Sequence, residues 1–360
     1  MPSSTRCRVY HWRSHLAQCL PARPRMHPVR APTIFLGVCH AWRNIALSAP
    51  SLWATISDED IPTVNFFKSL EIWLNRTRGL PLSLALRVPA AVRALVERHA
   101  LRVRNLELSL LSAEDLEQIT FPFTSLHSLA DENTTNTNTE YFSRNARECV
   151  ERLRGAPNLV ECNFSRVFYQ EDNIPNMLTH LSLQHLRLGQ SMSEDPHGMY
   201  DSTTAILRYL TLLALWALVI SIFDITSIDF LSFLTRSSPH LQSLHLWLVD
   251  SEVLHMMDEK ILEQYLQFLP GLTDLDIGPT SNSMFPLLKV LHTVPDLLPN
   301  LRNLKIRKAR VNSADYEILR SFRLESTSKE LLPDDITVAL RQLVQDGMRI
   351  YIGTKGRNYL

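Results

Sequence analysis

The sequence predicts an α/β chain in which a small helical segment precedes a long array of alternating strands and helices. Three observations support this prediction. Apolar residues near position 40 have a helical period, a frame with the spacing L-x-x-L-x-L recurs after residue 100, and the segments between the better-defined frames are helical in pattern. The 360 residues contain 45% hydrophobic and 21% charged residues, which are values typical of a globular protein.

Charge and cysteine usage exclude several classes of protein. The formal net charge is zero, which argues against nucleic-acid binding. The apolar run over residues 210–223 is shorter than the roughly 20 residues of a membrane-spanning helix, and we expect a buried strand with its approach there. Five cysteines without a CxxC pair or a signal peptide indicate reduced thiols in a cytoplasmic or nuclear protein. Prolines between residues 21 and 32 oppose the continuous helix of a transit peptide, although residues 1–57 carry seven arginines and no acid.

The N-terminal helix is predicted between Pro32, which suits a first helical turn, and Pro50, which ends the helix. The apolar pair Leu52 and Trp53 follows. One apolar stripe of a 3.6-residue period consists of Ile34, Phe35, Val38, Ala41, Trp42 and Ile45.

This segment resembles the second half of an F-box, in the form VC..WR.IAL..P.LW that is common in large fungal families. The matching residues are Val38, Cys39, Trp42, Arg43, Ile45, Ala46, Leu47, Pro50, Leu52 and Trp53. Cys19-Leu20-Pro21 is similar to the CLP that ends the first F-box helix, and Ala31-Pro32 to the AP that opens the second. Residues 9–15 replace the usual LPxEIL-like segment, so the first helix is degenerate.

Proteins of this family are substrate receptors of cullin-RING ubiquitin ligases, and their F-box docks on a small Skp-type adaptor. The resemblance therefore implies that the adaptor and the cullin ligase core are partners. The implied adaptor-binding residues are Leu20, Pro21, Val38, Cys39, Trp42, Ile45, Leu52 and Trp53. Without the resemblance, a helix with two tryptophans is more often ordinary core, whereas a docking helix leaves part of its apolar stripe uncovered.

A helix and a strand bridge the N-terminal segment and the array. The helix is predicted to end before Gly79, and residues 82–86 alternate with the period of a strand. One face of this helix carries Phe66, Phe67, Leu70, Trp73 and Leu74. The order WL.R......PLSL.L is also similar to the fungal F-box proteins, so the resemblance extends to about Leu86.

Eight frames predict an irregular leucine-rich-repeat solenoid, a curved and mainly parallel sheet with helices on the outer side. The frames begin at Val103, Leu126, Leu159, Leu183, Leu215, Leu241, Leu272 and Leu301, with intervals of 23 to 33 residues. The second and third apolar positions of each frame should point inward. Helices are expected between frames, with Ile228, Leu231 and Leu234 sharing one face and Ile261, Leu262, Tyr265 and Leu266 another.

The predicted domain boundaries follow from these patterns. The F-box-like segment covers residues 1–57, the bridge 58–100, the repeats 101–332 and a C-terminal cap 333–360. Within the repeats, residues 131–140 and 190–202 are expected to be loops. The cap should contain a helix after Asp334 and a strand over residues 348–352, followed by a flexible tail.

The sequence contains no catalytic signature, and we expect neither a cofactor nor a metal site. The ten glycines form no phosphate-binding loop, and the pairs His180/His185 and His240/His245 lack cysteine partners at zinc spacing. Asp274 and Asp276 point out of one strand, where a solvated face is a better interpretation than acid–base catalysis. An unrecognised enzyme would require a deep pocket lined by convergent polar groups.

The outward strand face is where recognition of an unknown protein target is expected. The candidate residues are His245, Trp247, Asp274, Asp276, Lys305 and Arg307. Trp247 either anchors a partner or folds under the next loop, and the sequence favours neither. These predictions indicate a non-catalytic substrate receptor of a cullin-RING ligase. The alternative is a leucine-rich-repeat scaffold without ubiquitin-ligase function.

Overall fold

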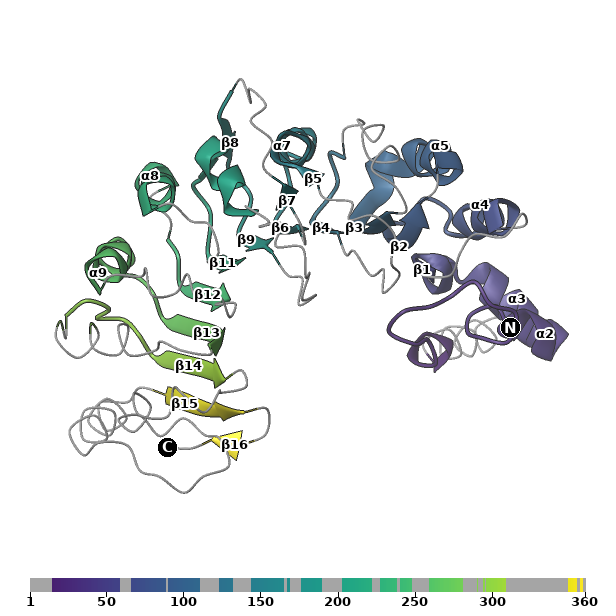
Figure 1. Ribbon diagram of the computed structural model, residues 1–360. Helices are drawn as coiled ribbons and strands as arrows, with labels where there is room; N and C mark the ends of the chain where they lie inside the picture. The colour runs from purple at the N-terminus through teal and green to yellow at the C-terminus, as the bar shows by residue number, and fades with distance from the viewer. Residues whose placement is uncertain are drawn as a thin grey trace, which may run out of the picture. The chain divides into compact units, whose positions relative to one another are not determined.

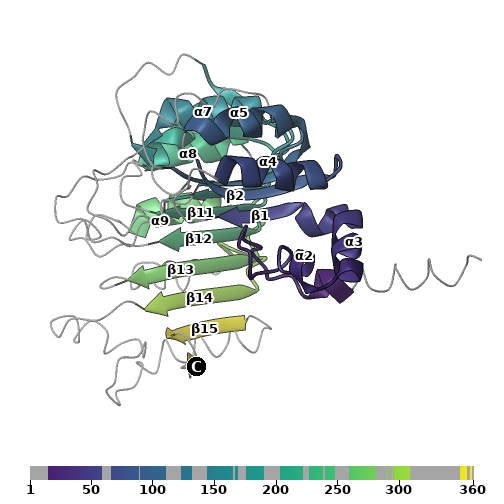
Figure 2. The same ribbon diagram turned by 90° about the vertical axis from the view of Figure 1, so that its right-hand side faces the viewer.

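The computed structural model has an α/β fold with a mainly parallel sheet, as predicted (Figures 1 and 2). The chain divides into two compact units, the first formed by residues 1–143 and 151–163 and the second by 144–150 and 164–360. The structure describes residues 15–58, 66–88, 90–110, 123–131, 144–164, 167–168, 176–189, 203–221, 227–237, 240–247, 259–280, 290, 294, 296–308, 349–354 and 357–358.

The first unit begins with helical residues 15–18 and then forms a sheet with the strand order β1-β2-β3-β4-β6. Its elements are α2 (Phe35–Val38), α3 (His40–Ser48), the 3-10 helix η1 (Pro50–Trp53), β1 (Thr55–Asp58), α4 (Phe66–Arg76), β2 (Leu82–Val88), α5 (Ala90–His99), η2 (Ala100–Arg102), β3 (Val103–Leu110), β4 (Ser128–Asp131) and β6 (Glu161–Phe164). Helix α7 (Ala146–Gly155) contributes residues to both units. The predicted apolar face of the helix before Gly79 is confirmed for Phe66, Leu70, Trp73 and Leu74, which are the buried residues of α4, whereas Phe67 is half-buried.

The second unit has the strand order β9-β11-β12-β13-β14-β15-β16, with β16 antiparallel to β15 and the other described pairs parallel. Its main-sheet strands and the helices between them are β9 (His185–Leu188), β11 (Ala217–Ser221), α8 (Ser227–Ser237), β12 (Ser243–Trp247), α9 (Glu259–Gln267), β13 (Asp274–Thr280), β14 (Asn303–Lys308), β15 (Arg349–Thr354) and β16 (Arg357–Asn358). Helices α8 and α9 lie on one side of the strands (Figure 1). Two small parallel pairs are β5 (Arg144–Asn145) with β7 (Val167–Phe168), and β8 (Leu178–His180) with β10 (Leu210–Leu212), which follows η3 (Thr203–Tyr209).

Each of the eight predicted frames coincides with a strand, and the inward leucines pair across the parallel ladder. In the second unit, five of them occupy one register row and are at most 2% exposed. This row is Leu186, Leu218, Leu244, Leu275 and Leu304. Parallel pairing without a register shift stacks equivalent residues, so each leucine is covered by its neighbours on both sides.

Five details of the sequence prediction are wrong. The expected single helix over residues 34–48 is interrupted at Cys39, and the apolar run over 210–223 supplies strands to two sheets rather than one buried strand. Ile228 is 77% exposed, because α8 turns Phe230, Phe233 and Leu234 inward instead. The expected C-terminal tail forms the β15–β16 pair. The loop predicted over 131–140 begins one residue too early, since Asp131 ends β4, and the rest of it, the loop at 190–202 and the helix at 336–344 lie outside the described residues.

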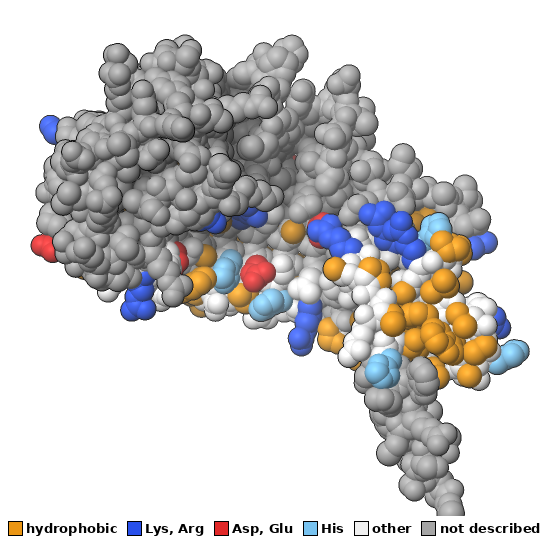
Figure 3. All heavy atoms as spheres, turned by 90° about the horizontal axis from the view of Figure 1, so that it is seen from below, with side chains coloured by type: hydrophobic (Ala, Val, Ile, Leu, Met, Phe, Trp, Pro, Cys, Tyr) orange, Lys and Arg blue, Asp and Glu red, His pale blue; other side chains and the backbone are white. Residues whose placement is uncertain are grey.

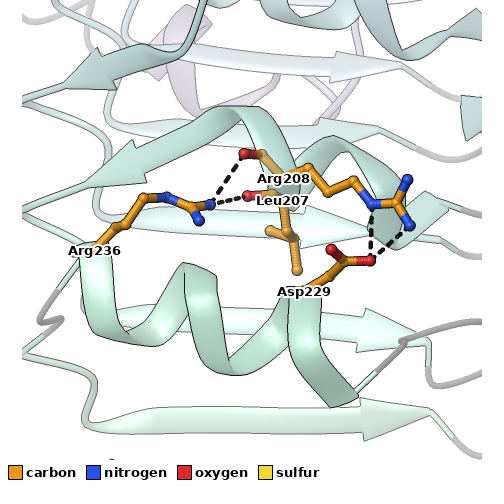
Figure 4. A network of polar contacts seen from close by, with 4 residues as sticks. All are labelled: Leu207, Arg208, Asp229 and Arg236. Atoms are coloured by element: carbon orange, nitrogen blue, oxygen red, sulfur yellow. Dashed lines mark hydrogen bonds and ion pairs between the residues drawn. The ribbon is translucent and has the colours of Figure 1, made fainter.

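Helix α8 is held to the preceding η3 and β10 by a polar network at both of its ends (Figure 4). Near its start, Asp229 accepts a hydrogen bond of 2.7 Å from Arg208 Nε. Near its end, Arg236 Nη2 donates to the Leu207 carbonyl at 2.8 Å and to the Arg208 carbonyl at 3.1 Å. The network supplies a donor to two carbonyls near the end of η3, and it connects both ends of α8 to η3.

The register row predicts a large cost for truncation at its centre. Leu218→Ala removes a side chain that is 0% exposed, and we expect the free energy of unfolding to fall by about 2–5 kcal/mol. Leu213→Ala is the matched control, because Leu213 is 45% exposed and its truncation should cost less than about 1 kcal/mol. Urea denaturation followed by circular dichroism measures both variants, and equal losses would contradict the stacked-row account.

Candidate protein-interaction surfaces

Helices α2 and α3 form a fixed corner at Cys39. The Cys39 backbone is extended, with φ −162° and ψ 169°, so it ends α2 and serves as the N-cap of α3. Two contacts hold the corner together. The rings of Phe35 and Trp42 meet edge to face with centroids 5.7 Å apart, and Arg43 Nε donates to the Leu36 carbonyl at 2.8 Å. We call these two helices the α2–α3 corner.

Two tryptophans lock the rear of the α2–α3 corner onto α4. Trp53 Nε1 donates to the Ala46 carbonyl at 2.9 Å, and Trp73 Nε1 donates to the Trp53 carbonyl at 2.7 Å. Their rings pack edge to face with centroids 4.9 Å apart. The Arg76 guanidinium lies 4.4 Å from the centroid of the Trp53 ring, where burial lowers the pKa of Arg76 below its usual value. Trp53 is therefore enclosed by apolar, polar and cation–π contacts at once.

The front of the α2–α3 corner is left uncovered by the described part of its own chain. Val38 is 55% exposed and Ile34 is 40% exposed, while Val29, in the turn before α2, is 68% exposed. Hydrophobic side chains gather over this part of the molecule in the space-filling view (Figure 3). Large apolar side chains exposed together in this way are typical of a surface that a partner covers.

The predicted adaptor-binding residues fall into two groups. The first group is at least partly accessible to solvent. It consists of Pro21, Val38 and Cys39, which are exposed, and Leu20, Trp42 and Ile45, which are half-buried. Leu52 and Trp53 are 0% exposed, so the expectation that they contact a partner directly needs correction. The 3-10 helix η1 turns both of them into the core against α4, and they can act only by holding α3 in place. Sequence reasoning included Ile34 in the stripe but omitted Val29, which has no helical spacing to mark it.

On the outward face of the second unit, the predicted target-binding residues form a polar group across three strands. The register aligns His245 on β12 with Asp276 on β13 and Lys305 on β14. Asp276 Oδ2 lies 3.8 Å from His245 Nδ1 and 3.9 Å from Lys305 Nζ. Two residues earlier on β13, Asp274 accepts hydrogen bonds from Thr273 Oγ1, at 2.6 Å, and from Asn303 Nδ2.

The remaining predicted target-binding residues are placed by their backbones alone. Trp247 pairs with Ser221 across the β11–β12 ladder, and Arg307 pairs with Gly353 across β14–β15. Their side chains lie outside the described part of the structure, so the role of Trp247 stays a prediction. A different aromatic residue, Trp216, is 41% exposed directly before β11, and sequence reasoning missed it because the frame marks only alternate strand positions.

The described residues give no sign of metal or membrane chemistry. No group of three or more His, Cys, Asp or Glu side chains gathers among them, and none of their helices is long and apolar enough to cross a membrane. His180 is buried, and its Nδ1 accepts the backbone N–H of Leu183 at 3.1 Å, which is the ordinary role of a satisfied core histidine. Cys19, Cys39, Cys149 and Cys162 form no disulfide among the described residues.

Comparison with models of protein families and with curated proteins finds no match for this chain.

The contacts between Trp53, Trp73 and Ala46 predict that the indole N–H of Trp53 contributes to the stability of the fold separately from its ring. Trp53→Phe keeps an aromatic side chain but removes the donor to the buried Ala46 carbonyl, so the free energy of unfolding should fall by about 1–3 kcal/mol. Trp216→Phe is the control, because Trp216 is 41% exposed and the change should cost less than about 0.5 kcal/mol. Chemical denaturation measures the difference, and a neutral Trp53→Phe would show that the bond contributes nothing.

Proposed function

We propose that this chain is a non-catalytic substrate receptor of a cullin-RING ubiquitin ligase, in which an F-box-like N-terminal segment docks on a Skp-type adaptor. The observation that carries the proposal is the uncovered apolar front of the α2–α3 corner, where Val38 is 55% exposed. An apolar helix of the core would bury this face, whereas a docking helix must present it. The residues that resemble the F-box are the same ones that build this corner.

The rigidity of the corner also supports docking. Trp53 and Trp73 fix α3 from behind, so the apolar front is presented without a further ordering cost on binding. The N-terminal segment is basic, because residues 15–57 contain Arg23, Arg25, Arg30 and Arg43 and no Asp or Glu, and of these arginines Arg23 is paired with Glu107 at 3.0 Å. Such a segment favours an adaptor surface that carries carboxylates around an apolar groove.

The repeated frames suit the second half of this function. In the proposal, residues 101–332 are an irregular leucine-rich-repeat solenoid, residues 58–100 join it to the F-box-like segment, and residues 333–360 cap it. The outward strand face then holds the protein target in the cytoplasm or nucleus. Parallel strands with a polar open face provide a broad rigid surface of the kind that repeat proteins use for binding. No cofactor enters this mechanism, because a receptor acts by bringing its target to the ligase.

A second candidate function is a protein-binding scaffold without an adaptor. Two observations favour it, namely the degenerate segment at residues 9–15 and the burial of Leu52 and Trp53, which removes two of the expected contacts. In this case the apolar corner would be covered by another partner. The two functions differ in whether the intact chain binds a Skp-type adaptor.

Adaptor binding is tested by introducing a charge at the centre of the exposed front. We expect Val38→Asp to weaken the affinity of full-length chain for a purified Skp-type adaptor by at least about tenfold, because the carboxylate would be buried against apolar surface. Ile72→Asp on α4 is the matched control, since Ile72 is 52% exposed in the same unit and should be neutral. Isothermal titration calorimetry measures all three chains.

Two results would contradict the proposal. No binding by the intact chain would favour the scaffold, and equal loss in Val38→Asp and Ile72→Asp would place the contact elsewhere. Repeating the titration at higher salt checks the contribution of the N-terminal arginines, because attraction between exposed charges weakens as ionic strength rises.

A further inference from the structure

Trp216 is an exposed aromatic side chain on a rigid backbone in the second unit. It occupies the second position of its frame, where the other frames of this unit carry Gln184, Gln242, Thr273 and Arg302. Its N–H donates to the Gln184 carbonyl at 2.8 Å, and its carbonyl accepts from Ser243 N at 3.1 Å. The ladder therefore fixes the main chain while 41% of the residue stays exposed. Aromatic residues held in this way are frequent anchors of protein interfaces, because little freedom is lost on binding.

A histidine and an arginine stand beside Trp216 on the neighbouring strand. The rings of Trp216 and His185 lie 5.2 Å apart, with 57° between their planes. Two residues further along β9, Arg187 points to the same open face. Arg187 Nε is buried and has no hydrogen-bond acceptor among the described residues, and no ion pair of Arg187 is formed with them. We call His185, Arg187 and Trp216 the β9–β11 subsite.

Among the described residues of its unit, the two strands that follow β9 in the sheet place no carboxylate beside Arg187. The next open-face positions are Ala217 and Val219 on β11 and Ser243 and His245 on β12. On the described strands of this unit that follow β9 in the sheet, the first open-face carboxylates come from β13, three strand steps from β9, which corresponds to about 14 Å at a strand spacing of roughly 4.8 Å.

We propose that the β9–β11 subsite binds an extended segment of a protein target, with an apolar side chain on Trp216 and an anionic group on Arg187. Trp216 is aligned with Gln184 in the ladder, and Arg187 lies three residues beyond Gln184, a distance of about 10 Å along the strand. A ligand in the extended polyproline II conformation advances about 3.1 Å per residue with three residues per turn, so an apolar and an anionic residue three positions apart lie about 9 Å apart on the same side of the ligand. The anion is a carboxylate or a phosphate, either of which a guanidinium binds through charge-assisted hydrogen bonds. This inference rests on the proposed role of the open strand face in target binding.

The test uses short labelled peptides and full-length chain in a fluorescence anisotropy titration. One peptide carries Leu and Glu three positions apart, a second carries phosphoserine in place of Glu, and a third carries Lys there. We expect an anionic peptide to bind and the lysine peptide not to bind, and the first two peptides show whether the anion is a carboxylate or a phosphate. Arg187→Gln and Trp216→Gln should each weaken binding by at least about tenfold. Two other frames carry glutamine at the position that corresponds to Trp216, namely Gln184 and Gln242. The Trp216→Gln variant is therefore compatible with the fold.

Matched controls separate the subsite from general effects of charge and exposure. Arg302→Gln makes the same charge change at an exposed position before β14, and Phe268→Ala removes an aromatic ring that is 47% exposed after α9. Both controls should bind the peptide like the unaltered chain. Circular dichroism of every variant verifies folding, and Arg187→Lys, which keeps the charge but loses the planar donor pair, replaces Arg187→Gln if that variant unfolds.

Several outcomes would overturn the inference. They are equal binding of the glutamate and lysine peptides, no loss in the Arg187 or Trp216 variants, no binding of any peptide, or preferential binding of a labelled single-stranded oligonucleotide included as a competitor. The assay contains no adaptor, so its failure leaves the docking of the α2–α3 corner untouched. Conversely, the Val38→Asp variant should bind the peptide with the affinity of the unaltered chain, whether or not the chain binds an adaptor.

Discussion

The structure depends on parallel pairing in a constant register. A strand such as β9, with four residues, cannot bury its leucines by itself, and its neighbours provide the apolar surface that covers them. Leu186 pairs with Leu218 and Leu218 with Leu244, so each inward residue meets an equivalent one. A shift by one residue would turn these leucines to solvent and His185 and Arg187 to the core, which explains why the pattern specifies its register strongly.

The same register creates an open face on the other side of the strands. Because side chains alternate along a strand, every buried leucine row is accompanied by a row of polar and small residues on the other side. His245, Asp276 and Lys305 share one such row. At the other end, His185, Arg187 and Trp216 bring together groups that different frames contribute. The face thus has a mixed-charge end and a basic, aromatic end, and a target that contacts both must carry complementary charges in the same order.

In the first unit, the two tryptophans decide which side of α3 is available. Trp53 and Trp73 occupy the rear of the helix, and each indole N–H meets a backbone carbonyl. The apolar residues of the stripe that do not reach this lock, Ile34 and Val38, are left at the front. The exposed front and its support are therefore products of one packing arrangement. In the proposed docking, buried residues such as Trp53 act through position rather than contact.

The sequence by itself determined the α/β class, the eight strands of the frames and the inward direction of their leucines, because period and spacing are local properties that the parallel ladder only had to align. It also located the α2–α3 corner and the buried face of α4. Tertiary structure alone decided the break at Cys39, the inward turn of Phe230 instead of Ile228, and the burial of Leu52 and Trp53. In each case the outcome depends on elements that are distant in the sequence, which local spacing does not specify. The role of Trp216 was also decided by tertiary structure. It precedes the alternating positions of β11, and it becomes part of a surface only because β9 brings His185 beside it.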